Sequence, residues 1–274
     1  MADSNIKFYD ATGWKKGLFY PYILASTSYV SDMHAKLLRS IATTLIVDCD
    51  IRNENTTNKK VYEKATIVNA DYVVPKDYIR KPEETVHSIV NFVENYVTSG
   101  KWEKDLIIPV QPAEDGTYDN CINLLLSEFG QRELKNMGGY IGLGGLKGIE
   151  DKKVQCKRIV AGVKLIHSFG FVAHLFGVYP GTYYRGSINP VFQYIRSRPA
   201  GLASLDSSVT ETMAVTGRAR DFGGNIRKFP DTRGDESVPW KVCIASANAW
   251  AVLNSINRNS RKPKQSTIPF RNLK

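Results

Sequence analysis

The sequence predicts an α/β protein built as a (β/α)8 TIM-like barrel, and three observations support this fold. Short apolar segments that resemble strands recur eight times along the 274 residues. Helical patterns lie between most of them, and this alternation is typical of a parallel sheet. Eight parallel strands are the number that closes such a sheet into a barrel. With a hydrophobic content of 42%, the chain can form one large core. We therefore expect residues 1–257 to form the barrel and 258–274 a basic C-terminal tail.

The predicted strands are three to six residues long, and several end at a polar residue or a glycine. In order they are Ile6–Tyr9, Tyr22–Ala25, Leu45–Val47, Tyr72–Val74, Leu106–Val110, Tyr140–Leu143, Phe171–Phe176 and Leu202–Leu205. The helical patterns are Ser31–Ala42, Glu83–Thr98, Tyr118–Lys135, Lys152–Ser168, Asn189–Ser197 and Pro239–Asn257. The last of these has proline in its first turn and an apolar face that includes Val242, Ala245, Ala249 and Leu253, so it is expected to complete the outer ring.

Two connections depart from this alternation. Residues 10–20 leave no room for a crossover helix, and residues 52–60 form a polar stretch without helical period. We therefore expect an irregular start to the barrel, with the first strands paired antiparallel or folded as a hairpin lid. Later in the chain, residues 216–234 are rich in glycine and arginine, which predicts an exposed loop.

Charge is distributed unevenly over the two halves of the chain. Residues 1–150 contain 17 Lys and Arg against 20 Asp and Glu, and residues 151–274 contain 20 against 7, so the net charges are −3 and +13. Six of these basic residues and none of the acidic ones lie in the tail. Because lysine and arginine release condensed counterions when they neutralise phosphates, the basic half favours a polyanionic partner over a merely soluble basic surface.

The cysteines and the apolar segments exclude other classes of protein. Cys49, Cys121, Cys156 and Cys243 form no CxxC or CxC pair, and only four histidines accompany them, so we expect buried thiols and no metal site. No apolar stretch approaches the roughly 18–20 residues of a membrane span. We therefore expect a soluble cytoplasmic protein without membrane contact.

Polar residues and glycines follow the predicted strands, where a parallel barrel places its chemistry. Each alone is more often a turn former or a helix cap. Asp206 comes immediately after the last predicted strand, which makes it the candidate nucleophile. The full set is Asp48, Asp77, Gln111, Gly144, Gly145, Phe176, Gly177 and Asp206, and we expect these residues to meet at one mouth of the barrel.

Taken in order, these segments resemble the tRNA-guanine transglycosylase superfamily over roughly residues 40–220. Asp48 matches the aspartate of a strand-ending DSGGF-like motif, although Cys49, Asp50 and Ile51 follow it here. Asp71 and Asp77 reproduce the six-residue spacing of the D-I-V-M-x-F-D pattern. The remaining matches are Val110-Gln111-Pro112 to VQG, Gly144-Gly145-Leu146 to GGL, Leu175-Phe176-Gly177-Val178-Tyr179 to LMGVG, and Leu205-Asp206-Ser207-Ser208 to FDCV.

The resemblance implies a base-exchange enzyme. The C-terminal zinc motif of the tRNA enzymes, CxCxxC with a histidine, does not follow Asp206, and a short zinc-free relative is similar to the phage and bacterial branch that exchanges guanine in DNA for a 7-deazaguanine. In that case the partners are DNA and a free 7-deazaguanine base. The alternatives are the same chemistry on tRNA and a basic nucleic-acid-binding barrel without catalysis.

The roles implied by the resemblance suit the chemistry of the residues. Asp206 would attack the anomeric carbon of the sugar, and Asp48 would act as general acid and base, with no cofactor, ATP or metal. Asp77 would accept hydrogen bonds from the N1–H and the amine of guanine, beside Gln111 and the Gly144-Gly145 backbone. Phe176 would either stack on the base or be an ordinary core aromatic at the end of a strand. Phosphate contacts are expected from Arg218, Arg220, Arg227, Arg233, Arg258, Arg261, Lys262 and Lys264.

Overall fold

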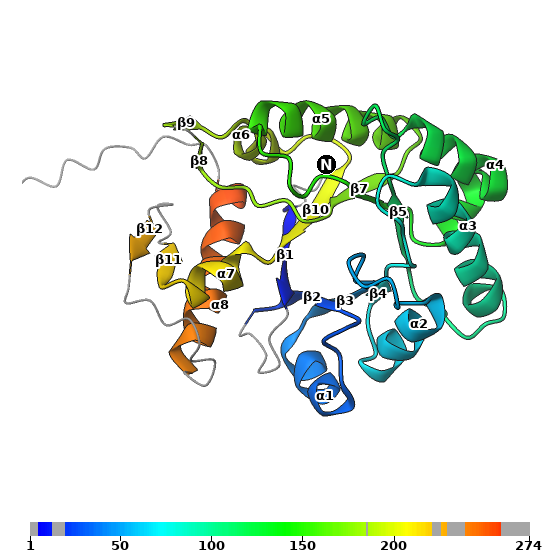
Figure 1. Cartoon of the computed structure of the whole chain (residues 1–274), viewed down its shortest axis with the longest axis horizontal. Coiled ribbons are helices and arrows are strands. Elements are labelled where there is room, and N and C mark those ends of the chain that lie inside the picture. The colour runs from blue at the N-terminus through cyan, green and yellow to red at the C-terminus, as the bar shows by residue number, and fades with distance from the viewer. Residues whose placement is uncertain (1–4, 13–19, 185, 221–225, 229–238, 259–274) are drawn as a thin grey trace, which may run out of the picture.

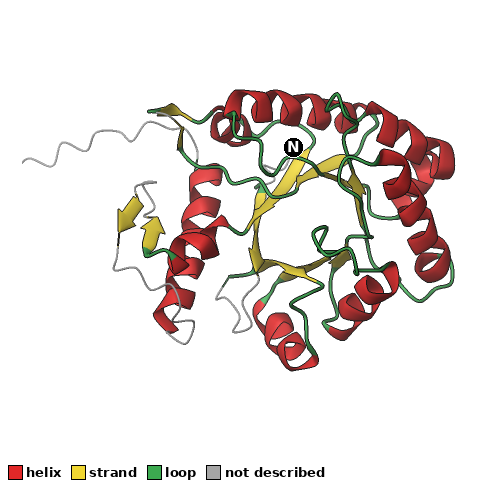
Figure 2. Ribbon diagram, viewed as in Figure 1, coloured by secondary structure: helices red, strands yellow, loops and turns green. Residues whose placement is uncertain are grey.

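Eight parallel strands form a barrel in the computed structural model of the chain (Figures 1 and 2). The structure describes residues 5–12, 20–184, 186–220, 226–228 and 239–258. The barrel strands are β1 (Lys7–Thr12), β2 (Tyr22–Ser26), β3 (Thr44–Asp48), β4 (Tyr72–Val73), β5 (Ile107–Val110), β6 (Tyr140–Leu143), β7 (Val172–Leu175) and β10 (Leu202–Ser207). A parallel bridge between Val73 and Leu106 joins the two ends of the sheet. The predicted fold class is confirmed.

Helices surround the strands on the outside (Figure 2). They are α1 (Asp32–Ile41), α2 (Asn58–Ile67), α3 (Pro82–Phe92), α4 (Asp119–Asn136), α5 (Lys152–Ser168), α6 (Pro190–Arg196), α7 (Val209–Val215) and α8 (Pro239–Asn257), and a π-helical turn, η1 (Val93–Val97), continues α3. Gly130 interrupts α4 because its φ of 70° and ψ of 161° are not helical. Two short antiparallel pairs, β8–β9 (Tyr183–Tyr184, Ser187–Ile188) and β11–β12 (Arg218–Arg220, Ile226–Lys228), lie outside the barrel sheet.

Two expectations about the start of the barrel are wrong. β1 pairs parallel with both β2 and β10, so the first strands are neither antiparallel nor a hairpin lid. The stretch 52–60 is a loop only as far as Thr57, whose side chain accepts a hydrogen bond from the Lys60 amide and caps α2. Val61 and Ala65, which are buried and four residues apart, pack α2 against the sheet. These two apolar residues come after the polar stretch, so the stretch itself has no helical period.

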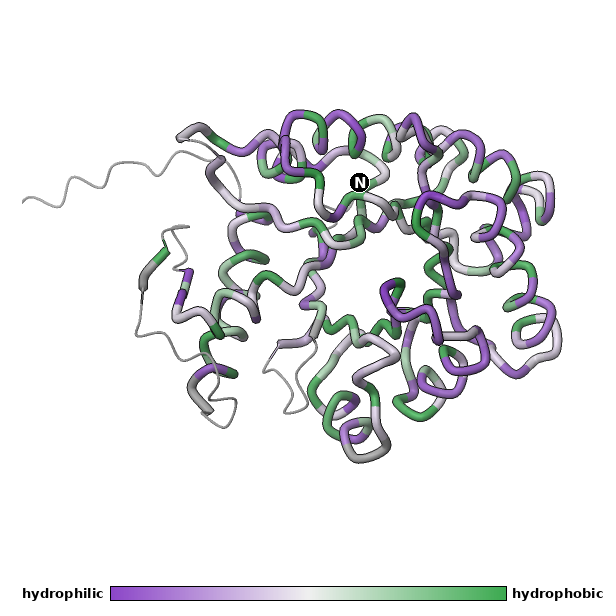
Figure 3. Tube along the Cα trace, viewed as in Figure 1, coloured by the Kyte–Doolittle hydropathy of each residue, from purple (hydrophilic) through white to green (hydrophobic). Residues whose placement is uncertain are grey.

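Side chains alternate between two cores along the strands, as the two-residue period of a strand requires. The outer core lies between the sheet and the helices and includes Phe8, Ile23 and Leu45. Their neighbours Tyr9, Leu24 and Ile46 belong to a separate inner cluster, which fills the barrel together with Val74 and Ile107. Along the Cα trace, apolar and polar residues alternate over short stretches of the strands and the helices (Figure 3).

The last helix holds the start of the first strand. The Asn257 side chain accepts a hydrogen bond from the Ile6 amide at 3.0 Å and donates one to the Ile6 carbonyl at 2.8 Å. Ala245 and Ala249 are fully buried, and Val242 and Leu253 pack partly buried against the core, so the predicted apolar face of α8 is confirmed. The tail lies outside the described residues from position 259 onward.

Candidate active site

A cavity of about 590 Å³ opens at the C-terminal end of the barrel strands. All eight residues that the sequence singled out as catalytic or base-binding line it. They come from the ends of β3, β5, β6, β7 and β10 and from the loop after β4, so the expectation that they share one mouth is met. Leu24 and Phe176 also belong to the inner cluster, which therefore forms the floor of the cavity.

Asp206 is held by its neighbours through one carboxylate oxygen. Oδ1 accepts hydrogen bonds from the Gly177 amide at 3.0 Å and from His174 Nε2 at 3.1 Å. Oδ2 accepts none from any residue that the structure describes. In the tautomer of His174 with the proton on Nε2, this nitrogen donates to Asp206, and Nδ1 accepts from the Ser204 hydroxyl at 2.8 Å. This arrangement fixes the side chain and leaves Oδ2 for a ligand.

Asp48 lies at the end of β3 and is partly buried. Burial raises the pKa of its carboxyl group to about 7, assisted by the negative charges of Asp77 and Asp206 and opposed by hydrogen bonds from the Asp50 and Cys49 amides. Both protonation states are therefore populated near neutral pH. A carboxyl group in this condition can donate a proton and later accept one.

Asp77 is buried deeper, with 5% of its surface exposed. The Cys49 thiol donates to Oδ1 at 3.0 Å, and Gln111 Nε2 donates to Oδ2. Burial raises the pKa of Asp77, while these two hydrogen bonds and the nearby Lys76 ammonium act in the opposite direction. The carboxylate is thus held rigidly, in an orientation set by two donors.

The glycine pair after β6 permits a close approach of two backbone segments. A Cβ at Gly144 would lie 2.2 Å from Gln111 Nε2, and one at Gly145, whose φ is +66°, would lie 2.6 Å from Pro112 Cγ. The Gly144 amide donates to the Val110 carbonyl at 2.9 Å. The Gly145 amide meets no acceptor among the described residues, so it is the amide that can donate to a ligand in the cavity.

Phe176 is more constrained than a free stacking platform. Its ring lies 4.6 Å from the His174 ring in an edge contact, and it covers Gly142 so closely that a Cβ there would be 2.1 Å from the phenyl ring. Part of the side chain still lines the cavity. Phe176 therefore packs inside the barrel and presents only its remaining surface to a ligand.

The basic residues that were predicted to contact phosphate differ in exposure. Arg218 is exposed at the start of β11, and Arg258 is exposed just after α8. Arg220 is 5% exposed, and its guanidinium donates to the Tyr179 hydroxyl at 3.0 Å and to Thr182 Oγ1, so it is a buried internal contact in this structure. Arg227 lies in β12. Arg233, Arg261, Lys262 and Lys264 are outside the described residues.

Several residues in or beside the cavity were not predicted from the sequence. Asp10 lies within β1, next to the cavity-lining Ala11, and is completely buried; Thr210 donates to its Oδ1, and its Oδ2 has no partner among the described residues. Burial, then the charges of Glu211 and Asp206, raise the pKa of Asp10. The rule that selected Asp206, a carboxylate directly after an apolar strand, would also have selected Asp10. The missed residues that line the cavity include Tyr29, Arg52, Ile79, Lys147 and Glu211.

The thiols differ from expectation in part. Cys49 and Cys121 are buried, Cys156 is partly buried, and Cys243 is exposed, so the prediction of four buried thiols is wrong for the last of them.

In the described part of the chain, no cluster of three or more His, Cys, Asp or Glu side chains is arranged to bind a metal ion. None of the described helices combines the length and the apolar character needed to cross a bilayer.

No protein-family model matches the chain, and no curated protein matches it either.

Proposed function

We propose that the protein is a DNA-guanine transglycosylase, which exchanges guanine in DNA for a free 7-deazaguanine base through a covalent glycosyl intermediate on Asp206. One observation carries this proposal: the eight residues that resemble the transglycosylase motifs line a single cavity at the mouth of the barrel. They come from segments that extend over 158 positions of the chain, from 48 to 206, and their convergence supports a shared role.

The geometry suits a double displacement. Asp206 Oδ2 attacks the anomeric carbon of the flipped deoxyguanosine as the bond from that carbon to N9 breaks, and Asp48 gives its proton to the departing base. In the second half, N9 of the incoming base attacks the same carbon, its proton returns to Asp48, and the bond to Asp206 breaks. A pKa of about 7 for Asp48 favours both transfers near neutral pH.

The choice of base is assigned to Asp77 and the Gly145 amide. Asp77 offers two acceptor oxygens in a fixed orientation to the N1–H and the amine of guanine, and the Gly145 amide offers a donor to O6. A buried site of this kind rejects bases that lack these groups, because its own polar atoms would be left unpaired.

The test measures incorporation of labelled guanine into duplex DNA and into tRNA. Wild type should label the DNA, and the Asp206→Asn variant should not, although its Oδ1 can still accept from Gly177 and His174 and the fold should persist. Glu114→Gln, at an exposed carboxylate outside the cavity, is the matched control. Labelling of tRNA alone would select the tRNA alternative, and labelling of neither substrate, or equal labelling by Asp206→Asn, would refute the proposal.

A further inference from the structure

Helix α5 has an unusual charge pattern. Its seventeen residues contain five lysines and arginines and no aspartate or glutamate, whereas α2 and α4 carry both signs. Lys153 and Lys157 are one turn apart, and like charges at this spacing destabilise a helix. No ion pair between described residues involves either of them or Lys164. The uniformly positive charge of α5 therefore does not stabilise the helix.

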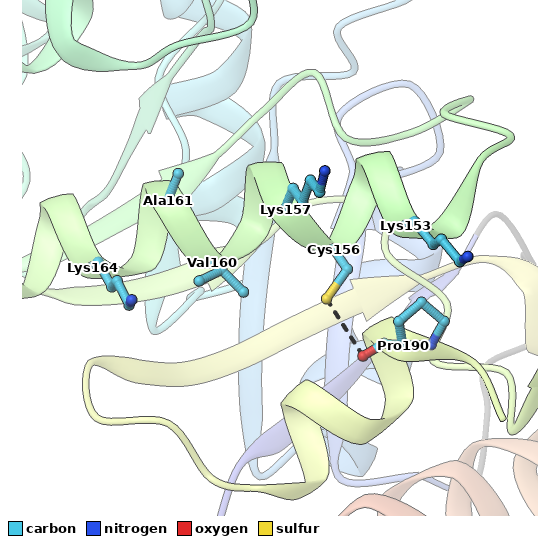
Figure 4. Close-up of a pocket in the computed structure, with 7 residues that line it drawn as sticks. All are labelled: Lys153, Cys156, Lys157, Val160, Ala161, Lys164 and Pro190. Atoms are coloured by element: carbon cyan, nitrogen blue, oxygen red, sulfur yellow. Dashed lines mark hydrogen bonds between the residues drawn. The ribbon is translucent and has the colours of Figure 1, made fainter.

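These lysines border a groove on the outside of the barrel (Figure 4). The groove has a volume of about 570 Å³ and lies between α5 and the start of α6. At 100° per residue, Lys153, Lys157 and Lys164 fall within about 40° of one another around the helix. The apolar surface between them comes from Val160, Ala161 and Pro190. Cys156, also in the lining, makes a 3.4 Å contact with the Pro190 carbonyl that joins the two helices.

The groove begins close to the mouth of the barrel. The loop that leads into α5 contains Gly144, Gly145 and Lys147, all of which line the active-site cavity. Lys147 and Arg52 also lie near each other there, since partial burial and then the Arg52 charge lower the pKa of Lys147. Two cations, Arg52 and Lys147, thus lie in the cavity lining, and Lys147 is on the loop that leads to α5. By contrast, Arg220, at the end of β11, is buried.

We propose that the α5 groove, formed by Lys153, Cys156, Lys157, Val160, Ala161, Lys164 and Pro190, binds the sugar–phosphate backbone of the nucleic-acid substrate beside the flipped nucleotide. The nucleic-acid identity of the partner rests on the proposed function. Lys153 and Lys164 are eleven residues apart, about 16 Å along the helix, which corresponds to about five phosphates of one DNA strand along the duplex axis. The lysines neutralise phosphates, and Val160, Ala161 and Pro190 contact the sugars.

The test compares two triple variants by the salt dependence of their affinity for a fluorescent DNA duplex. Lys153→Gln/Lys157→Gln/Lys164→Gln removes the groove lysines. Lys36→Gln/Lys59→Gln/Lys101→Gln removes three exposed lysines from the first 101 residues and has the same net charge. If each groove lysine contacts one phosphate, the first variant should flatten the slope of log K against log salt by about 2 to 3 units and the control should not. Circular dichroism checks that both variants are folded.

The outcome is independent of catalysis. Asp206→Asn should lose base exchange and keep the wild-type slope. A wild type that exchanges no base but has a steep slope that depends on the groove lysines would overturn the proposed function and leave the groove as a polyanion site. An unchanged slope in the groove variant, or an equal change in the control, would overturn the inference. Loss of binding to phosphatidylserine vesicles with an unchanged DNA slope would also overturn it, since the groove would then face a membrane surface.

Discussion

Asp48→Asn should be more stable than the wild type by an amount that is larger in alkaline than in acidic solution. The folded protein raises the pKa of this carboxyl group from 3.8 to about 7. Between these values the folded state binds more protons than the unfolded state, so the wild type loses stability as pH rises from about 4 to about 7. Asparagine has no charge to lose, and the variant escapes this loss.

The magnitude follows from the shift. Three pKa units correspond to about 4 kcal/mol at full deprotonation, of which about 2.5 kcal/mol develops between pH 5 and pH 8. The assay is urea unfolding of wild type and Asp48→Asn at these two pH values. The stability difference between the two proteins should grow by about 2 to 3 kcal/mol in favour of the variant. Glu114→Gln, an exposed carboxylate, should show no such change. A stability difference that is the same at both pH values would refute the raised pKa of Asp48.

Three further predictions concern the cavity and the tail. Asp77→Asn places a donor against the Cys49 and Gln111 donors and should weaken guanine binding by about 10- to 100-fold, at about 1–3 kcal/mol for each mispaired group; unchanged affinity by calorimetry would contradict the base-reading role. His174→Ala should lower kcat with little effect on KM, because Asp206 loses its positioning donor, and His174→Gln should recover part of the rate; equal kcat in all three proteins would exclude this role. Truncation after Asn257 should flatten the salt slope of DNA binding, and an unaltered slope would remove the tail as a contact.

The barrel was predictable because its signals are local. Eight short apolar segments and the helical patterns between them depend on neighbouring residues, and α8 has the predicted bounds, Pro239–Asn257. The convergence of Asp48 and Asp206 followed from the fold, since strand ends in a parallel barrel share one mouth. Local patterns set the fold, and the fold then set the approximate position of the cavity.

The features that were missed depend on contacts between distant residues. The partners of Arg220 are Asn248, Tyr179 and Thr182, which are 28 to 41 positions away, so its burial is invisible in a loop whose composition predicts exposure. The hydrogen bonds from His174 and Gly177 to Asp206 likewise span 32 and 29 positions. Their existence depends on the register between β7 and β10, which composition does not specify.

The distribution of carboxylates supports the proposed enzyme over the alternative of a nucleic-acid-binding barrel without catalysis. Asp48, Asp77, Asp206 and Glu211 line the cavity, and the pKa values of Asp48 and Asp77 are raised there. Asp10, adjacent to this group, has a raised pKa and an oxygen without a partner in the described part of the chain. A surface that only holds phosphates gains affinity from cations and loses it to carboxylates. Acids outnumber the two cations of the cavity lining, Arg52 and Lys147, and the groove lysines lie outside it on α5. This supports the proposal that the site performs proton transfer and nucleophilic attack at a sugar while the backbone is held elsewhere.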